Sequence, residues 1–197
     1  MQQHSMTAMA ARPTIAVVHG ICADQLGAAT PCSEYDIQTL INHLLFWGPS
    51  LEGAGRKSSV DPPAASEREL DLVTQGEWKG RLEAQIEGIV IAWSEPNAWE
   101  GTTQMGGPMQ LPASAIGGMI LGELVVHGWD LARASGQHPT WDDQLLDFVF
   151  QDLQMTAEQG RDMGIYGDQV QVPNTAPVLE QILGLTGRDP AWSRTDG

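Results

Sequence analysis

Glu123 and His127 stand four residues apart in the apolar stretch 119–135, MILGELVVHGWDLARAS. The apolar residues around them recur with a period near 3.6, which predicts a buried helix. Residues four apart project from the same face of a helix, and Asp130 continues that line one turn later. A carboxylate and an imidazole among apolar side chains need partners, because an unpaired buried charge costs several kcal/mol. The two side chains therefore bind each other, or they bind a metal ion.

His43 is the candidate for a third ligand, in the stretch 38–48, QTLINHLLFWG. This stretch also has helical apolar spacing, and His43 shares a face with Leu40 and Trp47. Two helices would then bring two imidazoles and a carboxylate to one interior point, a donor set suited to zinc with one coordination position left open. His19 is a further candidate ligand, although a histidine in a last helical turn more often interacts with the helix dipole.

The remaining pattern predicts an all-α bundle of four main helices with minor β content and its site between helices. Pro13 is expected to open a short first helix, which Gly20 ends. Gly48 and Pro49 are expected to end the second helix. The third helix should break near Gly76. The expected helices are 14–19, 37–47, 66–93, 113–135, 141–159 and 176–185, with a small hairpin turning at Gly106 and Gly107.

Charge and composition limit the possible partners. The sequence has 25 acidic and 10 basic residues, a formal net charge of −15, which argues against nucleic acid or an anionic membrane surface. No apolar run approaches the ~20 residues of a membrane span, and the N-terminus lacks the regions of a signal peptide, so we expect a cytoplasmic protein. Cys22 and Cys32 are too few for a disulfide framework. Residues 1–197 are expected to form a single metal-binding helical-bundle domain.

Three motifs resemble a known family. They are Thr30-Pro31-Cys32 with Tyr35, Asp36, Leu40 and Asn42-His43-Leu44; the run from Glu123 through His127-Gly128-Trp129-Asp130-Leu131-Ala132-Arg133-Ala134; and Leu185-Thr186-Gly187-Arg188-Asp189-Pro190. The family is the DinB-like superfamily of metal-binding four-helix proteins, in the branch related to the N-terminal domain of mycothiol-dependent maleylpyruvate isomerase. The resemblance covers about residues 23–190. The first motif departs from the family at Tyr35, where tryptophan is usual.

The resemblance implies a DinB-like four-helix bundle with a small β-hairpin and a short C-terminal helix. It also implies a divalent ion held by His43, Glu123 and His127, with Zn²⁺ expected and Ni²⁺, Fe²⁺ or Mn²⁺ also suited to the donor set. In the family, the open position takes water or the sulfur of a low-molecular-weight thiol such as mycothiol. Asp130 is a candidate to orient a ligand, or else to bond a neighbouring helix or loop. Trp47 and Trp129 are candidates to wall the pocket, or plain core residues.

Two hypotheses about function remain open. The first is a zinc- and mycothiol-dependent transferase or isomerase that acts on a small electrophile. The second is a non-catalytic metal-binding module, such as a stress or sensor protein, whose ion is structural and closed by a fourth protein ligand, for example His19 or Asp130. The maleylpyruvate isomerase activity itself is not carried over, because that enzyme has a further C-terminal domain for which this chain leaves no room. The sequence names no catalytic residue and no substrate, and it leaves a homodimer open.

Overall fold

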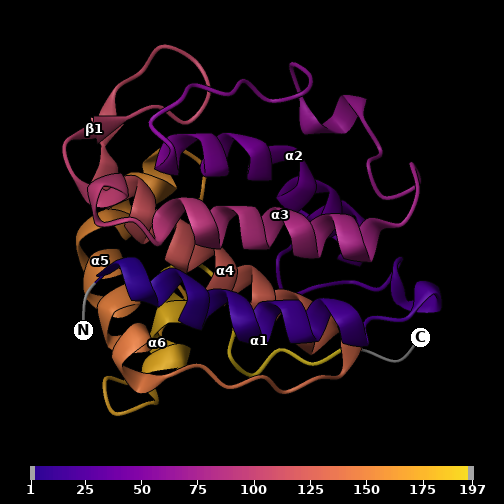
Figure 1. Cartoon of the computed structure of the whole chain (residues 1–197). Coiled ribbons are helices and arrows are strands. Elements are labelled where there is room, and N and C mark those ends of the chain that lie inside the picture. The colour runs from indigo at the N-terminus through magenta and orange to yellow at the C-terminus, as the bar shows by residue number, and fades with distance from the viewer. Residues whose placement is uncertain (1–2, 195–197) are drawn as a thin grey trace.

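Four helices pack in a closed ring: α1 and α2 each contact both α3 and α4 (Figure 1). The computed structural model describes residues 3–194. The helices are α1 (Met6–Gly20), α2 (Ile37–Gly55), α3 (Trp78–Trp93), α4 (Ala113–Ser135), α5 (Asp143–Asp162) and α6 (Val178–Leu185). Short 3-10 turns are η1 (Gln3–Ser5), η2 (Ala23–Gln25), η3 (Glu67–Glu69) and η4 (Pro96–Trp99), and β1 (Thr102–Thr103) pairs antiparallel with β2 (Leu111–Pro112). The predicted all-α bundle with a small hairpin is confirmed.

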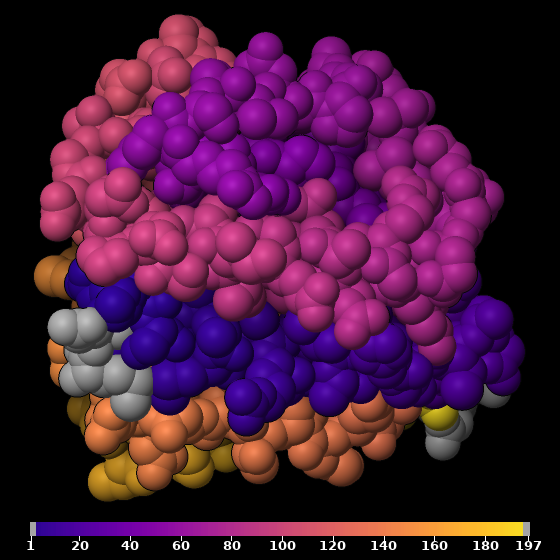
Figure 2. All heavy atoms as spheres, viewed as in Figure 1, coloured from indigo at the N-terminus to yellow at the C-terminus, as the bar shows by residue number. Residues whose placement is uncertain are grey.

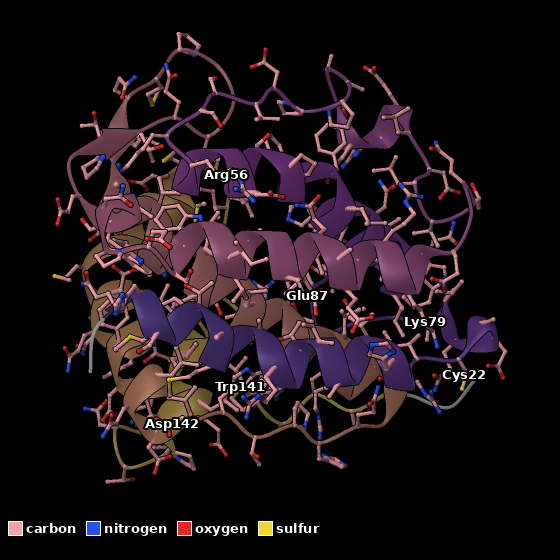
Figure 3. All side chains as sticks on the ribbon, viewed as in Figure 1. Cys22, Arg56, Lys79, Glu87, Trp141 and Asp142 are labelled. Carbon is pink, nitrogen blue, oxygen red and sulfur yellow. The ribbon has the colours of Figure 1, made fainter. Side chains whose placement is uncertain are left out.

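α4 is the central helix, and most of its residues are buried. It is long and apolar enough to cross a membrane by length and composition alone, but 83% of its most apolar window is buried inside the protein. α1 covers one side of it, and Thr14 on α1 donates a hydrogen bond to the Leu124 carbonyl at 2.7 Å. The indole of Trp141, labelled in Figure 3, lies against α1 and donates a hydrogen bond to the Ala10 carbonyl at 3.2 Å. The apolar sequence of α4 therefore serves the protein core.

Two helices extend past the prolines that were expected to limit them. α1 begins at Met6 with Pro13 inside it, and α2 continues through Pro49 to Gly55. A proline inside a helix removes one hydrogen bond and costs about 3 kcal/mol. In α2 the turns after Pro49 bury Leu51, whose carbonyl accepts a hydrogen bond from the Trp93 indole at 2.9 Å. Packing against α3 offsets the local cost, so the predicted ends at these prolines were wrong.

The predicted third helix is divided in two. η3 is a single turn, the chain then runs irregularly to Gly76 at φ +136°, and α3 begins at Trp78. The break near Gly76 was therefore confirmed, although the stretch before it is a connection rather than a helix. Asn42 ties this connection to α2, since its amide donates to the Glu67 carbonyl at 3.0 Å and accepts from the Leu72 amide at 2.8 Å. The connection is thus held over the face of α2 that carries His43.

The remaining predicted elements agree closely with the structure. Gly106 and Gly107 both have positive φ in the connection between the two short strands, and Gly136 ends α4 in the left-handed conformation. α5 and α6 each lie within three residues of their predicted bounds. Figure 2 shows α1 as an indigo band between α3 above it and the orange residues of α5 and the connection before it below, so the outer face of α1 lies at the surface.

We predict that two glycines of α4 respond oppositely to alanine. A Cβ at Gly117 would lie 2.3 Å from the Trp99 ring, which a hydrogen bond from Trp99 to the Trp93 carbonyl holds in place. Gly117→Ala should therefore lower the free energy of unfolding by about 1–3 kcal/mol. A Cβ at Gly122 would have no atom within 4 Å beyond its own helix backbone. Gly122→Ala should therefore raise the free energy of unfolding by up to about 1 kcal/mol. Denaturant unfolding measures both, and equal changes would refute the packing difference.

Candidate metal centre and its cavity

His43 on α2 and Glu123 and His127 on α4 meet at one point, with one ligand atom from each lying within 4.8 Å of the other two. The Glu123 carboxylate lies between the rings: its Oε2 is 3.6 Å from His43 Nε2 and 3.3 Å from His127 Nε2. The two rings stand edge to face, with centroids 5.4 Å apart. The structure thus brings together the three residues that sequence spacing selected.

Glu67 holds the outer nitrogen of His43, and the sequence analysis did not identify it. Its Oε2 lies 2.8 Å from His43 Nδ1 and accepts from the Trp47 indole at 3.1 Å, while its Oε1 accepts from the Tyr35 hydroxyl at 2.7 Å. Tyr35, from the first sequence motif, is therefore part of this network. Helical spacing could not find Glu67, because it begins the single 3-10 turn η3 in the connection between α2 and α3.

Asp130 holds the outer nitrogen of His127 in the same way. Its Oδ2 lies 3.1 Å from His127 Nδ1 and accepts from Arg188 Nη2 at 3.1 Å, while Arg188 Nη1 donates to the Thr186 carbonyl at 2.7 Å. Asp130 is fully buried, and its other oxygen has no partner among the described residues. Asp130 therefore contacts both a candidate ligand and the segment after α6, and its role in orienting that ligand stays a prediction.

The charges around the two imidazoles shift their pKa values. Burial alone lowers the pKa of His43, but Glu123 and Glu67 outweigh it and raise the pKa to about 9. Burial likewise lowers the pKa of His127, but Glu123 and Asp130 raise it overall. Burial raises the pKa of Glu123, but both histidines hold it well below its ordinary value. Without a cation, each imidazole therefore holds a proton more tightly than it would without its carboxylate neighbours, so a cation that binds there competes with protons.

A cavity of about 520 Å³ opens onto the three ligands. Its wall includes Trp47, Leu51, Met105 and Met119, together with residues 31–35, Arg68, residues 164–167 and residues 186–188. Trp129 is not part of this wall. Its buried ring packs under Arg133, with the guanidinium carbon 5.9 Å from the ring centroid. Residues two apart on a helix point to nearly opposite sides, so Trp129 turns away from the cavity that His127 faces.

The part of the chain that the structure describes supplies three ligands to this cluster and no fourth. His19 lies elsewhere, at the exposed end of α1, where its Nε2 is 3.1 Å from Glu83. Asp130 binds His127 and Arg188. Two imidazoles whose second nitrogens face carboxylates, with a third carboxylate between them, form a donor set typical of a divalent metal site. The residues present therefore fit such an ion, and the open side of the cluster faces the cavity.

Comparison with known proteins agrees with the geometry. A family model of the mycothiol maleylpyruvate isomerase N-terminal domain matches residues 8–132, which include all three candidate ligands. Two uncharacterized proteins, from two strains of Mycobacterium tuberculosis, are 28% identical to this chain over 176 residues, covering 88% of this chain and 90% of theirs.

Solved structures show the same fold. A crystal structure of the mycothiol-dependent maleylpyruvate isomerase matches with a TM-score of 0.61 at 11% identity, covering 98% of this chain and 81% of that one. A mutant of the same enzyme, with a histidine replaced by alanine, matches with a TM-score of 0.61 at 12% identity. The predicted DinB-like bundle is thereby confirmed.

We predict that Glu67 gives the metal-free protein a pH-dependent stability. His43 lowers the pKa of Glu67 from 4.5 to about 2, so the carboxylate's contribution is present above pH 4.5 and is lost as the pH falls toward 2. The pKa of His43 is raised from 6.5 to about 9, so its contribution is present below pH 6.5 and is lost as the pH rises toward 9. The stability difference between wild type and Glu67→Gln should therefore be largest between these limits and shrink on both sides.

Denaturant unfolding in a metal chelator, repeated from acid to alkaline pH, measures this difference. Glu69→Gln is the matched control, because Glu69 is exposed in the same turn and its side chain forms no hydrogen bond within residues 3–194. A Glu67→Gln difference that stays flat across this range would show that the carboxylate and the imidazole do not interact as charges.

Proposed function

Because this chain belongs to the mycothiol maleylpyruvate isomerase N-terminal domain family, we propose that it is a metal- and thiol-dependent enzyme. Its ion is zinc, its thiol is mycothiol or another low-molecular-weight thiol, and it acts in the cytoplasm as a transferase or isomerase on a small electrophile. One observation carries this proposal: three ligand atoms within 4.8 Å of one another face an open cavity. Catalytic zinc sites use three protein ligands and keep a position free, whereas structural sites are closed by four.

The chain's own residues prepare the donors. Glu67 and Asp130 accept from the Nδ1 side of His43 and His127, which leaves each Nε2 directed toward Glu123. This arrangement fixes the ring orientation of both imidazoles and directs each Nε2 toward the position that an ion would occupy. A zinc ion there would supply charge that lowers the pKa of a thiol and so makes the thiolate available at neutral pH. Nickel, iron or manganese would suit the same donors.

The cavity suits a small molecule. Its volume of about 520 Å³ falls within the range of about 300–1,000 Å³ that is common for small-molecule sites. Trp47, Leu51, Met105 and Met119 give it an apolar side that would receive the body of an electrophile or of the thiol. The named relative among solved structures is a mycothiol-dependent enzyme, which supports mycothiol as the thiol.

The alternative is a non-catalytic module with a structural ion, for example in a stress or sensor protein. Such an ion would need a fourth protein ligand to close its coordination. The described residues supply three, and the cavity keeps the fourth side accessible. We therefore favour the enzyme.

We predict that the purified protein holds about one equivalent of a divalent metal and that His43→Ala and His127→Ala lose it. Each variant removes one of three donors, so the remaining two should bind the ion at least tenfold more weakly. Mycothiol should raise the melting temperature of the metal-loaded wild type, because a ligand that binds only the folded state stabilises it, and should leave the variants unchanged. Elemental analysis and thermal melts measure both effects.

His19→Ala is the matched control, because His19 pairs with Glu83 at the surface, away from the cluster. It should keep its metal and its response to mycothiol. A full equivalent of metal in both cluster variants would exclude this site. Metal that is lost as expected, without any response to mycothiol in the wild type, would favour the structural ion instead.

A further inference from the structure

Part of the cavity wall lies beyond residue 132, where the family match ends. Residues 164–167, in the connection between α5 and α6, and residues 186–188, directly after α6, form this part of the wall. Tyr166 is the aromatic residue among them. It takes no part in the hydrogen bonds that orient the candidate metal ligands, so its role needs a separate explanation.

The ring of Tyr166 is held in place by close packing. A Cβ at Gly160 would lie 2.5 Å from the ring, so only glycine at that position of α5 lets the ring lie so close. The next residue, Gly167, packs against Gly187, where a Cβ would lie 2.9 Å from the Gly167 backbone. Arg161 joins the end of α5 to the end of α6 by donating a hydrogen bond to the Leu185 carbonyl at 2.9 Å. Tyr166 is therefore a preorganised part of the wall.

The hydroxyl of Tyr166 has no partner among residues 3–194. It forms no hydrogen bond within the described residues, whereas the hydroxyl of Tyr35 bonds Glu67. Tyr166 is partly buried and its hydroxyl remains accessible, so a molecule bound in the cavity can reach it. Burial and the nearby carboxylates of Glu123 and Asp152 raise the pKa of Tyr166, so the phenol keeps its proton and remains a donor. A fixed, protonated donor without an acceptor, in the wall of a ligand cavity, is suited to a ligand oxygen.

We propose that Tyr166 donates a hydrogen bond to a carbonyl oxygen of the electrophile bound in this cavity. The inference rests on the proposed function, in which the thiol sulfur occupies the end of the cavity formed by the three ligands. When the thiolate sulfur bonds to the β-carbon of an α,β-unsaturated carbonyl compound, the carbon–carbon π pair forms the double bond of an enolate, and the carbonyl π pair moves onto the oxygen. The phenol stabilises that oxygen, and the proton lost by the thiol ends on the carbon next to the carbonyl.

The electrophile that fits this arrangement has an apolar body and a conjugated carbonyl group. Trp47, Leu51, Met105 and Met119 receive the body, and Tyr166 receives the oxygen. Benzylideneacetone is a probe of this chemistry. Phenylbutene, in which a methylene replaces the carbonyl, has nearly the same shape and cannot accept a hydrogen bond.

The test compares the binding of these two probes to wild type, Tyr166→Phe and Met163→Leu by ligand-observed NMR titration. Tyr166→Phe keeps the ring against Gly160 and removes only the hydroxyl. It should weaken the binding of benzylideneacetone about three- to tenfold, as the loss of one neutral hydrogen bond does. The affinity for phenylbutene should change by less than about twofold. Met163→Leu is the control, because Met163 is 65% exposed and lies outside the cavity wall. It should leave both affinities unchanged.

Three results would overturn the inference: equal weakening of both probes, unchanged binding of benzylideneacetone in Tyr166→Phe, or no binding of benzylideneacetone to the wild type. Metal analysis of the same samples keeps the two proposals separate. A wild type that holds no metal refutes the proposed function, while the comparison of the two probes still decides the role of Tyr166.

Discussion

The carboxylate of Glu123, placed between two imidazoles in an apolar interior, is the constraint on which the rest of the site depends. α4 is apolar because it forms the centre of the bundle, and any charge on its inner face must be balanced there. His127 comes from the same helix and His43 from α2, so one carboxylate links the two helices. The two imidazoles in turn require partners for their outer nitrogens.

These partners extend the pairing outward in both directions. Glu67 meets His43 on one side, and Asp130 meets His127 on the other, with Arg188 beyond it. Acidic and basic groups thus alternate through the interior, and each charge lies beside one of opposite sign. The row also joins parts of the chain that are far apart in sequence: the connection before α3, helices α2 and α4, and the segment after α6. The site and the packing of these connections are therefore coupled.

The cavity combines walls of different origin. Helices of the bundle supply the candidate ligands and Trp47, within the region shared with the family. The connection after α5 and the turn after α6 supply Tyr166 and Arg188, beyond that region. One fold commonly carries different specificities in this way: a rigid scaffold holds the donors, and variable connections complete the wall. In this protein the connections are tightly packed as well, through Gly160 and Gly187.

The sequence alone determined the candidate ligands and the central helix, because a polar pair at helical spacing in an apolar stripe is a local signal. It also located the hairpin glycines and the end of α4, where backbone conformation depends on one residue. Only the tertiary structure decided that α2 passes through Pro49, since burial against α3 outweighs a local preference. It alone placed Glu67 against His43 and Tyr166 in the cavity wall, and it turned Trp129 away from the cavity. Irregular connections have no period to read, so their side chains are positioned by contacts with distant parts of the chain.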